Sequence, residues 1–155
     1  MFSKSILKSA LSTLHVICFT TIIAAGQSVS PQERICGKWE SAQKNLRIQV
    51  LLQNNQFKAK IIWFSDTEGK PIDYWTDVHN PDPALRHRKL LGMSILSGLV
   101  YKPSSNSWEN GIVYDSRHGR YWNASAFIGK KGLLHVRGYW HFKWIGKTMT
   151  FHRIP

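Results

Sequence analysis

The chain has 155 residues, of which 43% are hydrophobic and seven are Trp, and its formal net charge is +12. This length suits a single domain, and the composition excludes a disordered or collagen-like polymer. With only two cysteines, Cys18 and Cys36, the chain has neither a multi-disulfide framework nor a cysteine-based zinc or iron–sulfur cluster.

The first 26 residues have the three parts of a secretory signal peptide. Lys4 and Lys8 form a positive start, 10–23 is an apolar stretch, and small residues at 24–26 suit cleavage. We therefore expect residues 1–26 to be removed and 27–155 to form one exported domain, periplasmic or secreted.

The alternative for this segment is an uncleaved membrane anchor, which His15 and the Ser and Thr content disfavour. No second segment reads as a membrane span, so we do not expect an integral membrane protein. After cleavage Cys36 has no partner, and we expect it to be buried.

Short strand-like runs follow one another through the remaining sequence, separated by turn residues. Apolar and polar residues alternate along 46–52, and the return run 57–64 places Phe57, Ala59, Ile61 and Trp63 on one face. The expected strands are 38–42, 46–52, 57–64, 92–101, 107–115, 120–128, 133–142 and 147–153.

Residues 65–89 interrupt this pattern with Gly, Pro, Asn and Asp, so we expect a long loop that covers one end of the core. The other connections are short, as in a meander. We expect an all-β fold: an eight-stranded antiparallel up-and-down barrel with one long loop insertion, because closure removes exposed strand edges.

The two ends of this meander carry a candidate structural contact. Gly37 and Trp39 lie at the start of the first strand and Arg153 ends the last. In a closed barrel these strands are neighbours, so the Arg153 guanidinium can lie over the Trp39 indole. We interpret the three residues as structural.

Several stretches together resemble a known family. The sequence from Gly37 to Trp39 with a terminal Arg resembles the lipocalin and calycin superfamily, and four longer stretches are more specific. They are 60–63, 86–99, 108–115 with Gly119 and Tyr121, and 133–139 with 146–148 and Arg153. In this order they are similar to the bacterial family catalogued as domain of unknown function 2147, over essentially all of the chain after about Ile35. The resemblance implies an exported protein with a lipocalin-like barrel, and it assigns no catalytic residue.

A barrel of eight strands is either filled by side chains or holds one small ligand. We expect a ligand cavity with Trp63 and Tyr114 as walls. Arg137 shares a strand face with Tyr139 and is a candidate anchor for a polar head group. These residues would hold a small apolar or amphipathic ligand.

A further candidate is the hairpin at Asp115, which has two interpretations. In the functional one, Asp115 meets Arg137 or Arg86 at the barrel mouth and orients a polar ligand. In the structural one, Asp115 accepts backbone N–H groups in its own turn and Gly119 supplies a positive φ.

Sequence motifs for catalysis are weak. There is no G-x-S-x-G nucleophile motif, and His135 and His141 are too far apart along a strand to share one metal ion. We expect no catalytic residue, no metal and no cofactor, so the protein is interpreted as a binding protein and not an enzyme.

The positive charge suggests a second kind of partner. It favours anionic surfaces, while export makes nucleic acid an unsuitable main target. The alternative function is therefore a basic envelope-associated or adhesion protein that binds anionic glycans or lipid headgroups, and an exported hydrolase comes third.

Overall fold

A computed structural model describes residues 29–66 and 68–155. The expected signal peptide, residues 1–26, and Cys18 lie outside the described residues.

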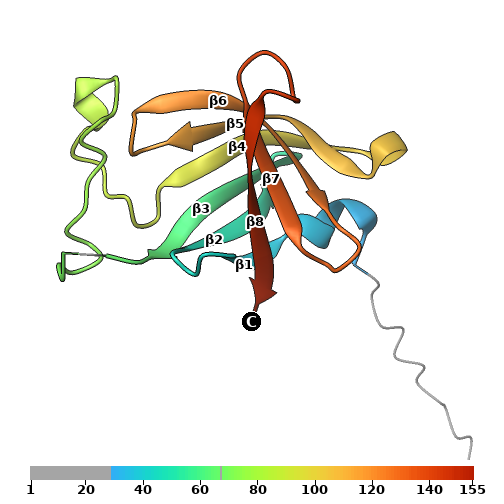
Figure 1. Ribbon diagram of the computed structural model, residues 1–155, viewed down its shortest axis with the longest axis horizontal. Coiled ribbons are helices and arrows are strands. Elements are labelled where there is room, and N and C mark those ends of the chain that lie inside the picture. Colours follow the sequence, from blue (N-terminus) through green and yellow to red (C-terminus); the bar gives the residue numbers. More distant parts are fainter. Residues whose placement is uncertain (1–28, 67) are drawn as a thin grey trace, which may run out of the picture.

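Eight antiparallel strands close into one barrel in which each strand pairs with its neighbours in sequence and the first pairs with the last (Figure 1). This confirms the predicted eight-stranded antiparallel up-and-down barrel. The strands are β1 (Gly37–Ser41), β2 (Leu46–Gln53), β3 (Gln56–Phe64), β4 (Ser94–Lys102), β5 (Ser107–Asp115), β6 (Arg120–Ile128), β7 (Leu134–Tyr139) and β8 (Gly146–Ile154). Three short 3₁₀ helices accompany them: η1 (Pro31–Ile35), η2 (Pro83–Leu85) and η3 (Pro103–Ser105).

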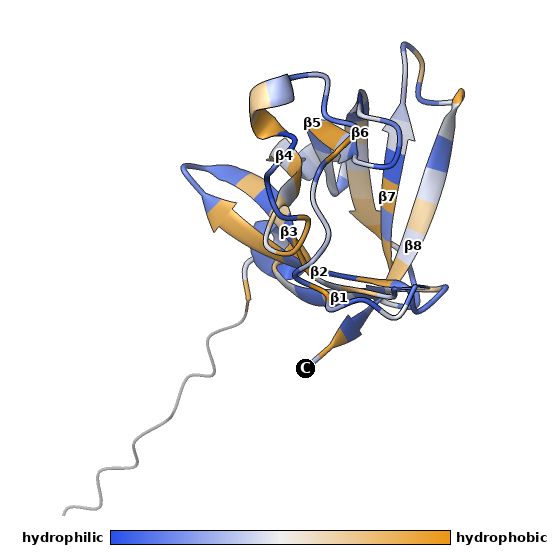
Figure 2. Cartoon of the chain, turned by 90° about the vertical axis from the view of Figure 1, so that its left-hand side faces the viewer, coloured by the Kyte–Doolittle hydropathy of each residue, from blue (hydrophilic) through white to orange (hydrophobic). Residues whose placement is uncertain are grey.

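The strands form where the sequence alternates between apolar and polar residues, and Figure 2 shows this alternation along β7 and β8. The β2–β3 hairpin turns at Asn54 and Asn55, both with positive φ (50° and 59°). Asn tolerates this conformation better than most residues, which is why the chain reverses there.

The inner face of the barrel is packed with side chains. Trp39, Phe57 and Trp108 are almost completely buried, and the rings of Phe57 and Trp108 meet edge to face at 6.2 Å. Each buried indole N–H has a partner: Trp39 Nε1 donates to the carbonyl of Ile35 at 2.8 Å, and Trp108 Nε1 donates to that of Gln32 at 3.0 Å. Both acceptors lie in η1, so this helix closes one end of the barrel.

The expected contact between the terminal strands is present. Trp39 pairs with Arg153 across β1 and β8, and the Arg153 guanidinium lies 4.2 Å from the centre of the indole ring. Its nitrogens donate to the carbonyls of Arg34 and Cys36. Arg153 therefore joins the last strand to η1 as well as to the core.

The predicted inner face of β3 is correct for Phe57, Ala59 and Ile61, which are buried, but wrong for Trp63 because of a β-bulge. Arg47 pairs with Trp63 but Ile48 pairs with Ile61, so Ile62 is the extra residue. The bulge shifts every later side chain by one position, and Phe64 packs toward the interior where alternation assigned Trp63. Trp63 lies instead beside Arg47, whose guanidinium is 4.8 Å from the ring centre.

Strand β7 is also shorter than predicted: it ends at Tyr139 and not at 142. The chain then forms a connection to β8, residues 140–145, here called the aromatic loop. It projects beyond the barrel at the top of both Figure 1 and Figure 2, on the side away from the C-terminus.

Candidate functional site

The long loop between β3 and β4 is fixed to the barrel by a buried carboxylate. Asp77 has no exposed surface, and its Oδ1 accepts a hydrogen bond from the Tyr114 hydroxyl at 2.7 Å. Its Oδ2 accepts from Asn80 Nδ2 and from an Arg88 guanidinium nitrogen, each at 2.7 Å. A buried charge is tolerated when it is paired and hydrogen-bonded in this way.

These contacts determine the ionisation of the cluster. Burial raises the pKa of Asp77, but the hydrogen bonds from Asn80, Tyr114 and Arg88 outweigh it and hold the pKa below its usual value. Burial and the neighbouring Asp77 carboxylate raise the pKa of Tyr114 well above its usual value. At neutral pH Asp77 is therefore ionised and Tyr114 is a neutral donor, as a stable loop anchor requires.

The Asp115 hairpin matches the structural interpretation. Asp115 Oδ1 accepts the backbone N–H of Arg117 at 3.0 Å, Oδ2 lies 2.7 Å from His118 Nδ1, and Gly119 has a φ of 63°. A Cβ at Gly119 would lie 1.9 Å from the carbonyl oxygen of His79, so this turn packs directly against the long loop.

Arg86 does not meet Asp115. Its Nε donates to the backbone carbonyl of Asn80 at 2.9 Å, inside the long loop. Two of the residues predicted from the sequence, Arg86 and Tyr114, thus bond to groups of the long loop. Asp115 bonds within its own turn.

Arg137 and Tyr139 lie on β7 at the base of the aromatic loop. Arg137 donates to the carbonyls of Lys143 and Trp144 and to the Thr148 hydroxyl, the last two at 3.1 and 3.0 Å. Tyr139 pairs with Asn123 and with Gly146. Trp63, Tyr114 and Arg137 therefore have separate partners, and none of them lines either of the two hollows described below.

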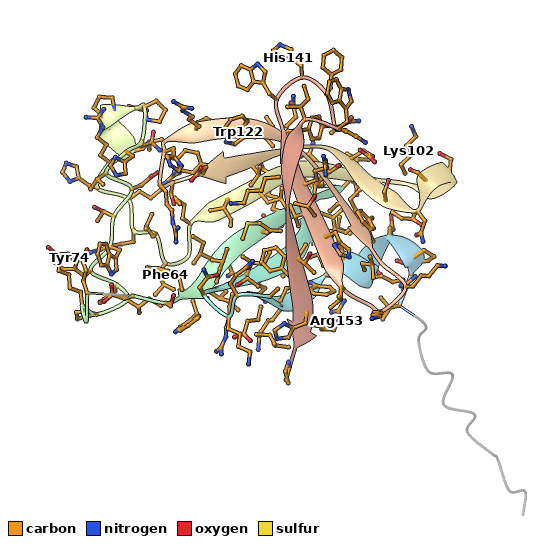
Figure 3. All side chains as sticks on the ribbon, viewed as in Figure 1. Phe64, Tyr74, Lys102, Trp122, His141 and Arg153 are labelled. Atoms are coloured by element: carbon orange, nitrogen blue, oxygen red, sulfur yellow. The ribbon has the colours of Figure 1, made fainter. Side chains whose placement is uncertain are left out.

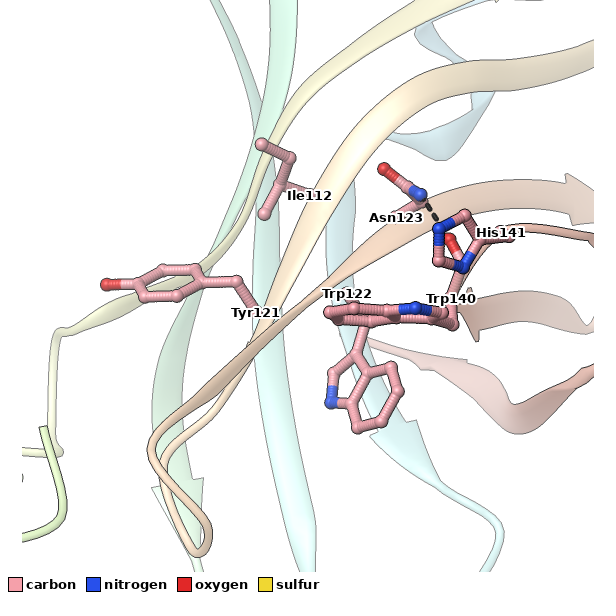
Figure 4. Close-up of a pocket in the computed structure, with 6 residues that line it drawn as sticks. All are labelled: Ile112, Tyr121, Trp122, Asn123, Trp140 and His141. Atoms are coloured by element: carbon pink, nitrogen blue, oxygen red, sulfur yellow. Dashed lines mark hydrogen bonds between the residues drawn. The ribbon is translucent and has the colours of Figure 1, made fainter. Parts of the chain in front are cut away.

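A hollow of about 380 Å³ lies beside the aromatic loop (Figure 4). Four aromatic rings contribute to it, and the Trp122 and Trp140 rings meet edge to face at 5.7 Å. The lining residues are Ile112, Tyr121, Trp122, Asn123, Trp140 and His141.

Unequal strand lengths produce this hollow. β7 ends at Tyr139, opposite Asn123, whereas β6 begins three residues earlier, at Arg120. Within the described chain, residues 120–122 have no strand partner on the β7 side. The aromatic loop crosses the gap and is attached by Asn123 Nδ2, which donates to the Trp140 carbonyl.

The chemistry of the hollow is amphipathic. Tyr121 is 48% exposed and Trp140 is 57% exposed, so large aromatic surfaces face solvent. Asn123 and His141 add polar atoms beside them. A ligand could therefore place an apolar body on the rings and a polar group at the rim.

A second hollow, of about 350 Å³, opens at the η1 end of the barrel, and it includes Cys36, Trp39 and Arg153. Cys36 is a free thiol that is only partly buried, so the expectation of full burial was wrong. Burial still raises the pKa of its thiol, and nearby Glu33 adds to this effect. The Arg153 guanidinium already bonds two carbonyls here, which leaves the first hollow as the stronger candidate.

The aromatic hollow was not predicted from the sequence, although aromatic residues lie next to basic ones at 120–122 and at 137–140, a pattern that suits stacking on a ligand when the rings face outward. Among residues 29–66 and 68–155, no three His, Cys, Asp or Glu side chains are grouped closely enough to hold a metal ion. None of the helices in this part of the chain has the length and apolar character of a membrane span.

Comparison with known proteins agrees with the fold. A solved structure described as "Protein HP1028 from the human pathogen Helicobacter pylori belongs to the lipocalin family" is similar, with a TM-score of 0.64 and 25% sequence identity. The match covers 83% of this chain and 85% of that one. No curated protein matches significantly. The model of the family described as "Uncharacterized protein conserved in bacteria (DUF2147)" matches residues 37–153, from the start of β1 nearly to the end of β8. The chain therefore belongs to the DUF2147 family.

Proposed function

We propose that this protein is an exported, non-catalytic binding protein that holds a small amphipathic ligand in the aromatic hollow between β6 and the aromatic loop. The observation that carries the proposal is a hollow of about 380 Å³ beside the edge-to-face pair of Trp122, which is half-buried, and Trp140, which is exposed. Lipocalin-like barrels are well suited to ligand binding, and the similar Helicobacter pylori protein is described as a lipocalin.

The proposal moves the ligand from the packed core of the barrel to the hollow beside the aromatic loop. The inner positions are taken by Trp39, Phe57 and Trp108, all but fully buried against one another and their neighbours. Removing such packing to admit a ligand would be costly. The aromatic hollow already exposes its rings, so a ligand there needs no rearrangement of the core.

Ligand contacts follow from the lining. The apolar part lies against Trp122 and Trp140, where each aromatic contact contributes about 0.5–1.5 kcal/mol beyond buried area. The polar part lies near Asn123 and His141 at the rim. The proposal includes export, which the signal-peptide pattern of residues 1–26 supports.

The test is a titration with the amphipathic fluorescent probe 1-anilinonaphthalene-8-sulfonate, followed by displacement with a series of fatty acids. We expect saturable binding that Trp122→Ala weakens about tenfold, since a buried aromatic contact of about 1.4 kcal/mol is lost. Trp63→Ala is the matched control, because Trp63 is a partly exposed Trp that lines neither hollow. Binding that does not saturate, or that is equally sensitive to both variants, would contradict the proposal.

A further inference from the structure

We propose that the aromatic loop, residues 140–145, inserts its apolar side chains into the interface of an anionic lipid bilayer and holds the protein on the membrane surface. This goes beyond the ligand proposal, because Phe142 and Trp144 do not line the aromatic hollow.

The loop exposes an unusual amount of apolar surface. Trp140, Phe142, Trp144 and Ile145 are 57%, 58%, 75% and 53% exposed, although they fall within six consecutive residues. The rings of Phe142 and Trp144 stack at 5.9 Å, so they form one apolar tip. Single exposed apolar residues are common on proteins, but a contiguous patch marks an interaction site.

Side chains of the neighbouring strands fix the aromatic loop in place. The Arg137 guanidinium donates to two loop carbonyls and to Thr148 on β8, and Asn123 on β6 donates to the Trp140 carbonyl. Lys143 is paired with Glu109 on β5. The loop is thus bonded to three strands, β5, β6 and β7. Because it is already ordered, it loses little further conformational freedom when a partner binds.

The loop also stands at the top of the molecule, where Figure 3 labels His141, far from Arg153 in the same view. A projecting tip can enter a soft interface without a matching cavity. A stable protein partner would instead require about 20–30 residues on each side.

The charge of this part of the chain complements an anionic surface. From Ser116 to the C-terminus the sequence contains no Asp or Glu and eight Lys or Arg residues, of which Arg153 lies far from the loop. Lys143 is compensated by Glu109, but Lys147 is exposed at the start of β8 and His141 is exposed in the loop. Trp side chains prefer the headgroup region, and basic residues add attraction to anionic lipids.

The experiment measures co-sedimentation of the chain from Gln27 onward, which contains every strand of the barrel, with vesicles. One set is phosphatidylcholine alone, and the other is equal parts of phosphatidylcholine and phosphatidylglycerol. We expect binding to the anionic vesicles that weakens as salt is added, because salt screens the attraction.

A fluorescence experiment tests whether the loop enters the bilayer. Brominated lipids should quench part of the Trp emission, and Trp144→Phe should reduce that quenching while largely preserving binding.

Three variants separate the contributions. Phe142→Ser with Trp144→Ser should weaken binding more than tenfold, since two large apolar side chains no longer leave water when the loop meets the bilayer. Lys147→Gln should weaken it about fivefold. Phe127→Ser is the matched control, because Phe127 is 46% exposed on β6 outside the loop and should leave binding unchanged. Circular dichroism in the near ultraviolet checks that each variant is folded.

Failure to bind anionic vesicles, or equal binding to both vesicle types, would overturn the inference. Binding that the double variant leaves unchanged would also overturn it. So would a protein that does not bind vesicles but forms a dimer that depends on the loop. The probe titration described above contains no lipid bilayer. Failure of membrane binding is therefore distinguishable from failure of the ligand proposal.

Discussion

The Tyr114 hydroxyl donates to Asp77 at 2.7 Å and thereby joins strand β5 to the long loop, 37 residues earlier in the chain. The Asp77 carboxylate is fully buried, so this bond fixes the loop to the barrel. It also supplies one of the hydrogen bonds that compensate the buried charge of Asp77.

Loss of this hydroxyl should destabilise the protein. We expect Tyr114→Phe to lower the free energy of unfolding by about 1–3 kcal/mol, because Asp77 loses a donor while it stays buried. Tyr101→Phe is the matched control: its hydroxyl donates to Asn106 at an exposed site, so the change should be small. Urea unfolding measures both, and equal effects would contradict the role of the buried bond.

Asp77 should also make the protein sensitive to acid. Its pKa is lowered in the folded state, so its stabilising contribution is complete above the unfolded pKa of about 3.9 and is lost as the pH falls through the lower folded value. We expect Asp77→Asn to flatten the dependence of unfolding free energy on pH below about 4. A variant as acid-sensitive as the wild type would show that other groups control this transition.

Much of the fold could be predicted from the sequence because its determinants are local. Alternation located the eight strands, and Asn54 and Asn55 marked a hairpin with the right backbone preference. When consecutive strands pair in the order of the sequence, closing the sheet brings β1 beside β8. This pairing places the Arg153 guanidinium over the Trp39 ring.

The candidate site could not be predicted in the same way. The bulge at Ile62 moved Trp63 from the expected face, and alternation contains no signal for one extra residue. Residues 140–142 continue the strand-like pattern, yet the chain leaves the sheet at Tyr139. The burial of Asp77 depends on Tyr114 and Arg88, which are distant in sequence, so its importance is visible only in three dimensions.

The contact between the terminal strands should be energetically coupled. We expect Trp39→Ala to cost about 3–5 kcal/mol through lost core packing, and Arg153→Ala to cost less. The double variant should show a coupling of about 0.5–3 kcal/mol, since residues in contact share part of their effect. Strict additivity in urea unfolding would show that the guanidinium over the indole contributes nothing.

The proposed export makes a direct prediction about the mature chain. Protein isolated from its own host should have the mass of a chain that begins near Gln27, because the small residues at 24–26 suit cleavage. Intact-mass spectrometry measures this. A mass that corresponds to all 155 residues would show that the first segment is retained.

Binding beside the aromatic loop, away from the packed core, is the central claim, and the seven Trp indole N–H groups report on it directly in a ¹H–¹⁵N correlation spectrum. On titration with 1-anilinonaphthalene-8-sulfonate we predict progressive, saturable shifts of the Trp122 and Trp140 signals, because both rings line the aromatic hollow. The Trp39 and Trp108 signals should stay in place, since these indoles are buried and bonded to η1 carbonyls. Shifts of Trp39 and Trp108 without shifts of Trp122 and Trp140 would place the ligand inside the barrel and contradict the account.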